Sequence, residues 1–453
     1  MKKTLAALIF NGLLCGLAAG GDHWPQWRGP SLDGTSDSKN LPEKWSEQEN
    51  VKWKVKLPSW SGSTPAIWGD RIFVPSASEF IQGAEAKNVK GMGGSRKVEG
   101  LDLLLLCLSK ADGKELWRST LKGANYQIGK QNMSTPSPVT DGAMVWWLTG
   151  TGVLTALTVE GKEAWQVDLQ KTYGKFGLNW GYGSSPLLYE SMVVVPVLHG
   201  MTTDEPSYIV AFDGKTGKAV WRVERPTDAP NESPDAYTTV MPMKVGASMQ
   251  LIVGGGDYFT GHDPKTGKEL WRCGGLNPAE KDPKKPDAPA APNPWFRMVC
   301  SPAIVDDLVF GCIKKKVTVV CRAGGEGLVT ATHTAWTSKD ITYDVPTPVS
   351  DGKYMYILND GGMMTCVDPK TGKALYDKQR LPRGTYSASP LLADGKIYVT
   401  SEGARTTVLA AGPEFKVLAE NQVDDPYTLS SIAVSGSELF LRTSSHLYCI
   451  SKK

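Results

Sequence analysis

The stretch Ala211-Phe-Asp213-Gly-Lys-Thr216-Gly217-Lys-Ala-Val-Trp221 decides the fold, because it recurs along the chain. Close copies occupy residues 261–271 and 366–376, and looser copies end at Trp117 and Trp165. Repetition at a period of roughly 40 to 50 residues is typical of propellers and solenoids. The repeat therefore predicts an array of similar small units.

Each copy has the composition of a hairpin. Asp213 is placed to accept backbone N–H groups of a tight turn, and Gly217 supplies the positive φ that such a turn needs. Apolar residues on both sides of the turn predict two strands. The large aromatic residue that closes each copy is expected to wedge between neighbouring units and bury apolar area there. We assign this structural docking role to Trp53, Trp117, Trp165, Trp221, Trp271, Trp336 and Tyr376.

A second phrase precedes each copy of the first. It consists of Ser or Thr followed by Pro, a few apolar residues, a turn and an apolar strand. Units begin near residues 63, 136, 184, 239, 301, 347, 389 and 431, and the copies near 239 and 431 are degenerate. The two phrases together predict four short antiparallel strands per unit, which is the size of a propeller blade.

The last unit lacks the aromatic-bearing outer strand. A strand of that kind stands at the other end of the chain, at residues 50–57 around Trp53. We therefore predict an all-β, eight-bladed β-propeller of four-stranded antiparallel blades over 50–453, with the ring closed by the N-terminal strand. Residues 21–49 remain as an N-terminal extension.

Residues 1–20 resemble a signal peptide. Lys2 and Lys3 precede an apolar run that ends in small residues, and this run is too short for a membrane span. Cys15 lacks the preceding small residue of a lipidation signal, so we expect no lipid anchor. The mature chain is expected to be monomeric and periplasmic or extracellular, without a transmembrane helix.

Charge and metal-ligand types exclude several functions. The formal net charge is only +3, and the basic run 314–316 falls where a turn is expected, so we predict no nucleic-acid partner. The five histidines are scattered without ligand spacing, and we predict no metal site. Equivalent cysteines of different units, Cys107, Cys321, Cys366 and Cys449, are expected to be small buried residues rather than disulfide partners.

The repeated phrase is similar to the tryptophan-docking motif of the pyrroloquinoline quinone (PQQ) repeat, and 211–221 matches this motif at every defined position. The stretch 24–30, Trp-Pro-Gln-Trp-Arg-Gly-Pro, also resembles the start of secreted bacterial PQQ-like propellers. The resemblance implies one of two functions. One is that of the quinoprotein dehydrogenases, and the other is that of non-catalytic scaffolds such as the lipoprotein propeller of outer-membrane protein assembly.

The dehydrogenase resemblance implies a site that this chain meets only in part. Those enzymes hold PQQ with Ca²⁺, use an Asp base, and in the alcohol dehydrogenases stack the cofactor on a disulfide of adjacent cysteines. The chain has no adjacent cysteines. The only candidates for cofactor-contacting residues are Trp180, Asn179, Trp295 and Asp344. We therefore predict a scaffold without a cofactor that binds a protein, peptide or polysaccharide of the cell envelope. PQQ-dependent oxidation of alcohols or sugars is the alternative, and a hydrolase or lyase site at the propeller mouth also stays open.

Strand parity predicts which face binds. Turns between the first and second strands and between the third and fourth strands are uniformly short, whereas long connections at 78–100, 199–207 and 277–297 share the opposite face. We call this the long-loop face, and its opposite the tight-turn face. Polar and aromatic residues before the innermost strands are predicted to ring the channel mouth on the long-loop face and to anchor a partner. They are Trp60, Asn132, Trp180, Tyr182, Tyr237, Trp295, Arg297, Tyr343, Asp344, Tyr386 and Tyr427.

Overall fold

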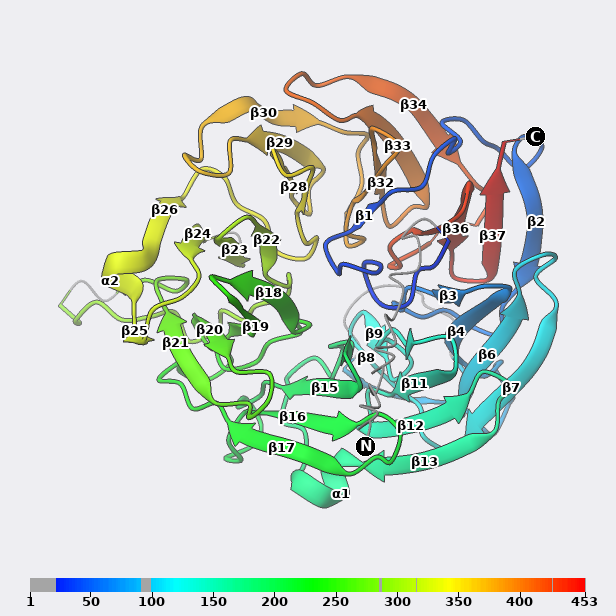
Figure 1. The fold of residues 1–453 in the computed structure, drawn as a ribbon, viewed down its shortest axis with the longest axis horizontal. Coiled ribbons are helices and arrows are strands. Elements are labelled where there is room, and N and C mark those ends of the chain that lie inside the picture. The colour runs from blue at the N-terminus through cyan, green and yellow to red at the C-terminus, as the bar shows by residue number, and fades with distance from the viewer. Residues whose placement is uncertain (1–21, 91–98, 285–286, 315, 426, 453) are drawn as a thin grey trace, which may run out of the picture.

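The computed structural model describes residues 22–453, apart from 91–98, 285–286, 315, 426 and 453. The predicted signal peptide lies outside the described residues. Eight small antiparallel sheets form a ring around a central axis (Figure 1). This arrangement confirms the prediction of an all-β, eight-bladed propeller.

The first four blades follow the chain order from the innermost strand outward. The first blade holds β3 (Ala66–Trp68), β4 (Arg71–Ala77), β6 (Leu103–Ser109) and β7 (Glu115–Leu121). The second holds β10 (Val139–Thr140), β11 (Met144–Leu148), β12 (Val153–Thr158) and β13 (Glu163–Asp168). The third holds β14 (Leu187–Tyr189), β15 (Met192–Val197), β16 (Tyr208–Asp213) and β17 (Ala219–Glu224). The fourth holds β18 (Met241–Val245), β19 (Ser248–Gly255), β20 (Tyr258–His262) and β21 (Glu269–Cys273).

The remaining blades complete the ring. The fifth blade holds β22 (Ala303–Val305), β23 (Leu308–Ile313), β24 (Val317–Arg322) and β26 (Thr334–Ser338). The sixth holds β27 (Val349–Ser350), β28 (Met355–Leu358), β29 (Met363–Val367) and β30 (Ala374–Arg380). The seventh holds β31 (Leu391–Ala393), β32 (Lys396–Thr400), β33 (Arg405–Ala410) and β34 (Val417–Gln422). The eighth holds β35 (Ala433–Ser435), β36 (Glu438–Arg442), β37 (His446–Ser451) and β2 (Val51–Lys56).

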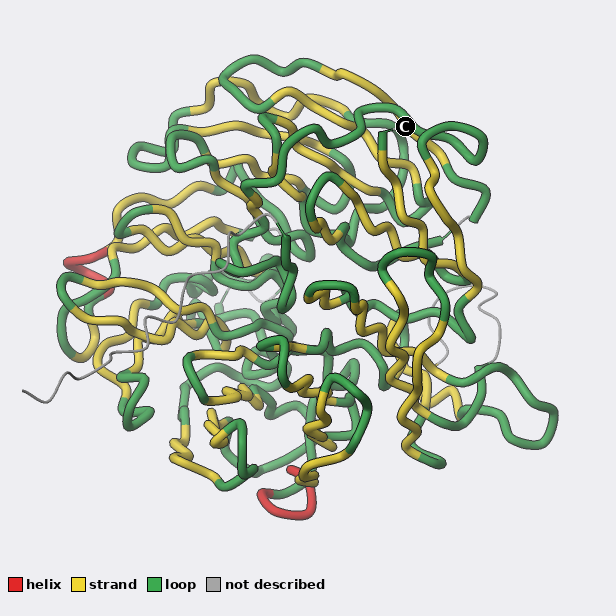
Figure 2. Tube along the Cα trace, turned by 45° about the vertical axis from the view of Figure 1, so that its right-hand side comes forward, coloured by secondary structure: helices red, strands yellow, loops and turns green. Residues whose placement is uncertain are grey.

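Several short elements were not predicted. β1 (Thr35–Ser36) adds to the inner edge of the seventh blade, and β25 (Gly327–Leu328) adds to the outer edge of the fourth. A small separate sheet joins β5 (Lys87–Lys90), β8 (Tyr126–Ile128) and β9 (Gln131–Asn132) on the long-loop face. Figure 2 shows strands throughout the blades and two short helices, α1 (Leu169–Tyr173) and α2 (Thr330–His333). Within the described residues, neither helix has the length and apolarity needed to cross a membrane.

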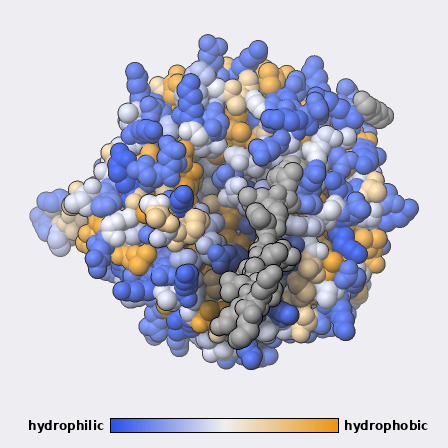
Figure 3. All heavy atoms as spheres, viewed as in Figure 1, coloured by the Kyte–Doolittle hydropathy of each residue, from blue (hydrophilic) through white to orange (hydrophobic). Residues whose placement is uncertain are grey.

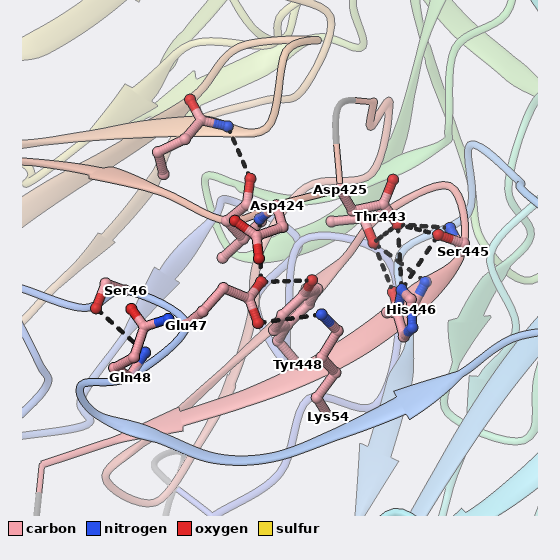
Figure 4. Close-up of polar contacts among 12 residues, drawn as sticks. Ser46, Glu47, Gln48, Lys54, Asp424, Asp425, Thr443, Ser445, His446 and Tyr448 are labelled. Carbon is pink, nitrogen blue, oxygen red and sulfur yellow. Dashed lines mark hydrogen bonds and ion pairs between the residues drawn. The ribbon is translucent and has the colours of Figure 1, made fainter.

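The N-terminal strand closes the ring, as predicted. β2 pairs antiparallel with β37, so that Lys54 lies opposite Tyr448. Figure 4 shows how Glu47 secures this junction by accepting hydrogen bonds from Lys54 Nζ, Tyr448 Oη and the backbone N–H of Asp424, each at 3.0 Å. The two ends of the chain therefore share one blade, in which β2 supplies the outermost of the four strands.

Most of the repeated tryptophans reach the next blade. A Cβ atom at Gly217, which has φ of +70°, would lie 2.6 Å from the ring of Trp165. The indole N–H groups donate to backbone carbonyls of the following blade: Trp53 to Lys110 (3.0 Å), Trp117 to Val159 (2.9 Å), Trp165 to Gly214 (2.9 Å), Trp221 to Pro264 (3.0 Å) and Trp336 to Pro369 (2.9 Å). Glycine at the turn therefore makes room for an aromatic ring from the preceding blade.

Two of the docking positions differ from this pattern. Trp271 is buried and donates to Gln250 Oε1 of its own blade at 2.8 Å, because the fifth blade has no Asp-x-x-Thr-Gly turn to receive it. Tyr376 packs edge-on against Phe415 of the seventh blade, with ring centroids 5.6 Å apart. The seven described cysteines are all free and buried, which confirms the prediction made for the repeat-equivalent ones.

Candidate functional site

The central channel holds a cavity of about 730 Å³. Its wall comes from the residues that begin the innermost strands. Its rim comes from the crossings between blades on the long-loop face, including Trp180, Tyr237, Arg297 and Asp344. Pockets of roughly 300 to 1,000 Å³ are the size that holds small molecules in proteins. The channel is therefore the candidate site.

The Ser and Thr residues of the repeated Ser/Thr-Pro phrase form the wall. Backbone N–H groups donate to the hydroxyl group of the next blade from Thr64 to Ser137 (2.9 Å), Ser137 to Ser185 (3.0 Å), Thr239 to Ser301 (2.9 Å), Ser301 to Thr347 (3.0 Å), Thr347 to Ser389 (3.0 Å) and Ser389 to Ser431 (3.0 Å). The six accepting hydroxyl groups all belong to residues that line the cavity, and we call them the hydroxyl belt. The belt links neighbouring blades and faces the channel.

The N-terminal extension forms the floor. Trp24 exchanges backbone hydrogen bonds with Ile67 of the first blade, and Pro25 O accepts from the N–H of Thr140 in the second. Further along, Gly34 O accepts from the N–H of Leu392 in the seventh blade. The extension thus runs over the tight-turn end of the channel from the first and second blades to the seventh, and its blue trace passes near the centre of Figure 1. Trp27 of this segment lines the cavity, so the channel is a cup that opens on the long-loop face.

A buried guanidinium group fixes the floor in place. Arg28 is 2% exposed and donates to the carbonyl groups of Thr347 (3.0 Å), Pro348 (2.7 Å) and Asp33 (2.5 Å). Burial lowers the pKa of Arg28 to about 10, which still leaves the group charged at neutral pH. Hydrogen bonds to charged groups are stronger than neutral ones, so Arg28 ties the extension firmly to the sixth blade.

The rim combines an aromatic ring with charges of both signs. The indole N–H of Trp180 donates to Glu232 Oε1 at 2.9 Å. Arg297 lies 3.9 Å from Glu232 and 3.9 Å from Asp344, distances too long for hydrogen bonds. Its Nη1 atom is buried and has no hydrogen-bond partner among the described residues. Arg297 is therefore held by charge attraction while part of its donor capacity stays unused.

An ion pair crosses part of the rim. Lys130, in the crossing from the first blade to the second, lies 2.7 Å from Glu402 in the β32–β33 turn of the seventh blade. Glu402 also accepts from the hydroxyl group of Ser387 at 2.5 Å. Lys130 and Ser387 both line the cavity. The pair joins blades that are not neighbours and narrows the opening of the cup.

The residues predicted to ring the mouth separate into groups. Four line the cavity, and they are Trp180, Tyr237, Arg297 and Asp344. Five are buried in the walls, and they are Trp60, Asn132, Tyr182, Tyr343 and Tyr386. Trp295 is 51% exposed and does not line the cavity. Tyr427 is half-buried in the crossing from the seventh blade to the eighth and packs edge-on against Trp60, with ring centroids 6.3 Å apart. The buried members pack or hydrogen-bond within the scaffold; Tyr182 Oη, for example, donates to Pro196 O at 2.8 Å.

Buried carboxyl groups support the wall from behind. Glu99 accepts from Asn132 Nδ2 (2.7 Å), Ser59 Oγ (3.0 Å) and Asn125 Nδ2 (3.3 Å), and burial raises its pKa to about 7. Asp235 accepts from three backbone N–H groups, including that of Asn179 at 2.7 Å, and burial raises its pKa to about 7 as well. Both groups anchor long-loop connections, and neither lines the cavity.

Several cavity residues were not predicted. Trp27, Lys130 and Asp360 line the cup, and Glu402 braces it. The recurring hydroxyl residue before each Pro is visible in the sequence, where the pattern predicts only the start of a strand. Its repetition at one position in every unit was the available signal for a ring of hydroxyl groups. Nothing in the repeat indicated the path of the extension that places Trp27 at the floor.

The cup meets the requirements of a quinone site in part. Trp180 and Asp344 line it and offer a planar face and a carboxylate, whereas Trp295 lies outside. No cluster of three or more His, Cys, Asp or Glu side chains able to hold a metal ion occurs within the described part of the chain. Trp180 and Asp344 are thus the side chains that would contact such a cofactor.

A Ser, His and Asp cluster on the long-loop face has no hydrolase geometry. Ser445 Oγ donates to Asp425 and lies 3.1 Å from His446 Nδ1, and the same Nδ1 lies 3.5 Å from Asp425. Figure 4 shows these side chains beside Thr443, which also donates to Asp425. In a catalytic triad the two ring nitrogens face different partners. Here one nitrogen faces both, so the cluster orders the loop beside the ring junction.

Similarity to known proteins agrees with this architecture. The sequence matches the family described as outer membrane protein assembly factor BamB over residues 102–281 and 296–413. No curated protein sequence matches the chain. BamB from Moraxella catarrhalis has a similar structure, with a TM-score of 0.57 and 14% identity over 88% of this chain and 98% of that protein.

Two dehydrogenases have the same fold. A europium-containing methanol dehydrogenase has a TM-score of 0.64 and 11% identity over 95% of this chain and 98% of its own. The quinohemoprotein alcohol dehydrogenase of Comamonas testosteroni has a TM-score of 0.62 and 12% identity over 97% of this chain and 82% of its own. Identities this low show the fold alone. Because the family match covers more than half of the sequence, the chain belongs to the BamB family of PQQ-like β-propellers.

Proposed function

We propose that this protein is a non-catalytic scaffold of the cell envelope that binds its partner in and around the cup on the long-loop face. The observation that carries the proposal is the rim, where half-buried Trp180 and Arg297 flank an open cavity. Aromatic and arginine side chains are enriched at binding hot spots. The predicted signal peptide and the family, described as an outer membrane protein assembly factor, support an envelope location.

The charge distribution also supports a recognition role for this face. Arg297 keeps unused donors beside Asp344, and Lys130 is paired with Glu402 across the rim. Paired charges of both signs select partners by complementarity more than by raw attraction. Apart from the residues drawn in grey, hydrophilic side chains predominate on the face shown in Figure 3, with smaller hydrophobic areas between them. The rim itself combines the indole ring of Trp180 with charges of both signs.

Photocross-linking in cells tests the scaffold. A photoreactive residue at position 130 on the rim should give partner adducts, because this side chain lines the cavity and is half exposed, whereas one at position 215 or 265 in the tight turns should give none. The paired change Trp180→Ala with Arg297→Ala should remove the adducts while the propeller still folds; because buried Glu232 loses two partners, a lower melting temperature is expected for this variant. Lys215→Glu with Lys265→Glu is the control. Adducts that form mainly from the tight-turn positions would contradict the proposal.

Quinone-dependent oxidation is the second candidate, and it is favoured by Trp180, Arg297 and Asp344 meeting at one cavity. Reconstitution with Ca²⁺ and PQQ, followed by dye-linked oxidation of alcohols and aldoses, separates the two. The scaffold proposal expects dye reduction at the level of a quinone-free blank. Substrate-dependent reduction well above that blank would favour the enzyme.

A further inference from the structure

The hydroxyl belt presents hydrogen-bond donors to the cup. A serine or threonine hydroxyl group has one donor and two acceptor sites. Each belt hydroxyl group already accepts one backbone N–H, at 2.9–3.0 Å. No protein acceptor for its own hydrogen is found among the residues that the structure describes. The wall therefore offers a ring of O–H donors, and a buried donor without a partner is costly.

The rim of the cup adds hydrogen-bond acceptors to the donors of the hydroxyl belt. Asp344 and Asp360 line the same cavity, and their carboxylate oxygens only accept hydrogen bonds when ionised. Arg297 lines the same cavity, and its buried Nη1 atom has no hydrogen-bond partner among the described residues. A ligand that fills the cup must therefore both accept hydrogen bonds at the wall and donate them at the rim.

An aromatic face completes the set. Trp180 is half-buried, and Gly129 covers one side of its ring so closely that a Cβ there would lie 3.0 Å away. At the floor, Trp27 provides a second half-buried indole. Indole rings bury apolar surface of a ligand by dispersion contact while polar groups around them fix its orientation.

We propose that the cup binds a neutral saccharide, either a free oligosaccharide or the end of a glycan chain. A sugar ring carries hydroxyl groups that both donate and accept, and an apolar C–H face that stacks on indole. It thus satisfies the belt, the rim carboxylates and Trp180 together. The inference rests on the proposed function, since it names the partner class of the same site. The cavity of about 730 Å³ has room for about two or three sugar units.

Charge disfavours the other occupants of a one-ended cup. A peptide that enters end-on brings a charged terminus. Its carboxylate could reach Arg297 only beside Asp344, which lies 3.9 Å from Arg297, and its ammonium group could reach Asp344 only beside Arg297. Like charges at short range in a poorly solvated site cost free energy. An acidic sugar meets the two rim carboxylates, whereas a neutral sugar meets no such repulsion.

Calorimetric titration of the full mature chain tests the inference. The probes are maltotriose, cellotriose and N-acetylated chitotriose as neutral trisaccharides, with trigalacturonic acid as the charged control. We expect at least one neutral probe to bind with Kd below about 1 mM, and trigalacturonic acid to bind at least about tenfold more weakly. Amylose, cellulose and chitin pelleting assays then separate a free oligosaccharide from a chain end as the natural source.

Matched variants place the binding in the cup. Trp180→Ala should weaken binding about tenfold or more, whereas Trp295→Ala, which removes an exposed indole of the same face outside the cavity, should not change it. At the belt, Thr347→Val should weaken binding and Thr347→Ser should restore it, with melting curves recorded for both.

The inference is overturned if no neutral trisaccharide binds more tightly than about 10 mM, if trigalacturonic acid binds as well as they do, or if Trp295→Ala weakens binding as much as Trp180→Ala. Protein cross-links from the long-loop face would then still support the scaffold. Cross-links confined to the tight-turn face would overturn the scaffold independently of the sugar results.

Discussion

Glu99 should make the stability of the propeller depend on pH in a direction opposite to that of most surface carboxylates. Its side chain is 1% exposed, and burial raises its pKa from 4.5 to about 7. Between these two values the folded protein binds more protons than the unfolded chain, so the free energy of unfolding falls as the pH rises. At about 1.4 kcal/mol for each pKa unit, the rise corresponds to about 3 kcal/mol lost between about pH 4.5 and pH 8.

The substitution Glu99→Gln isolates this contribution. The amide keeps the size of the side chain but does not titrate, so the other raised carboxyl groups, Asp235 and Asp257, contribute equally to both proteins. Urea denaturation followed by tryptophan fluorescence at pH 5 and pH 8 gives the free energies of unfolding. The wild-type protein should lose about 2.5 kcal/mol more than the variant over this interval. Equal losses in the two proteins would refute the reasoning.

Two further predictions concern the scaffold. Deleting either 22–57 or 431–453 removes part of the shared eighth blade and should abolish soluble folded protein, and a 22–57 deletion that melts like the full chain would show that the ring closes differently. Gly217→Ala should cost about 2 to 4 kcal/mol, because it strains a positive φ and drives a Cβ to 2.6 Å from the ring of Trp165. Gly395→Ala has φ of +69° and open space, so it should cost only about 1 kcal/mol in the same melting assay.

The fold could be predicted because each repeat carries its own local instructions. Asp213 accepts from the N–H and the hydroxyl group of Thr216 at 2.7 Å, and Gly217 adopts φ of +70°, so this turn is encoded within five residues. Ring closure was equally readable, because the last unit lacked a strand and β2 supplied it. The turn could be predicted from neighbouring residues alone, and ring closure could be predicted by counting the strands of each unit.

The sequence did not predict which side chains face the cavity and which are buried in its wall. Strand parity correctly assigns Tyr182 and Trp180 to the same crossing, yet Tyr182 turns into the core and only Trp180 reaches the cavity. Neighbouring residues of an extended segment point in different directions, and packing against the next blade decides which one faces the channel. Tyr343 and Tyr386 are likewise buried in the walls instead of facing the cavity.

The belt illustrates a second limit of sequence reasoning. Each hydrogen bond, such as that from Ser301 N to Thr347 Oγ1, joins residues of different blades. A single repeat therefore contains half of each bond, and its purpose appears only when the ring is assembled. The same residues that begin the strands thus also link the blades and line the cup.

The extension changes what kind of ligand this fold can receive. A propeller open at both ends would let a chain thread through its axis, whereas here Trp27 lies at the floor and Arg28 binds three carbonyl groups beneath it. Each of these bonds to a buried charged group stabilises the floor by about 1.5 to 3 kcal/mol, so displacing the segment to admit a ligand from below would be costly. Entry and exit must then share the rim of Trp180, Arg297 and the Lys130–Glu402 pair. Selectivity of the cup is consequently set by this one opening, and changes at the rim should alter binding rates as well as affinity.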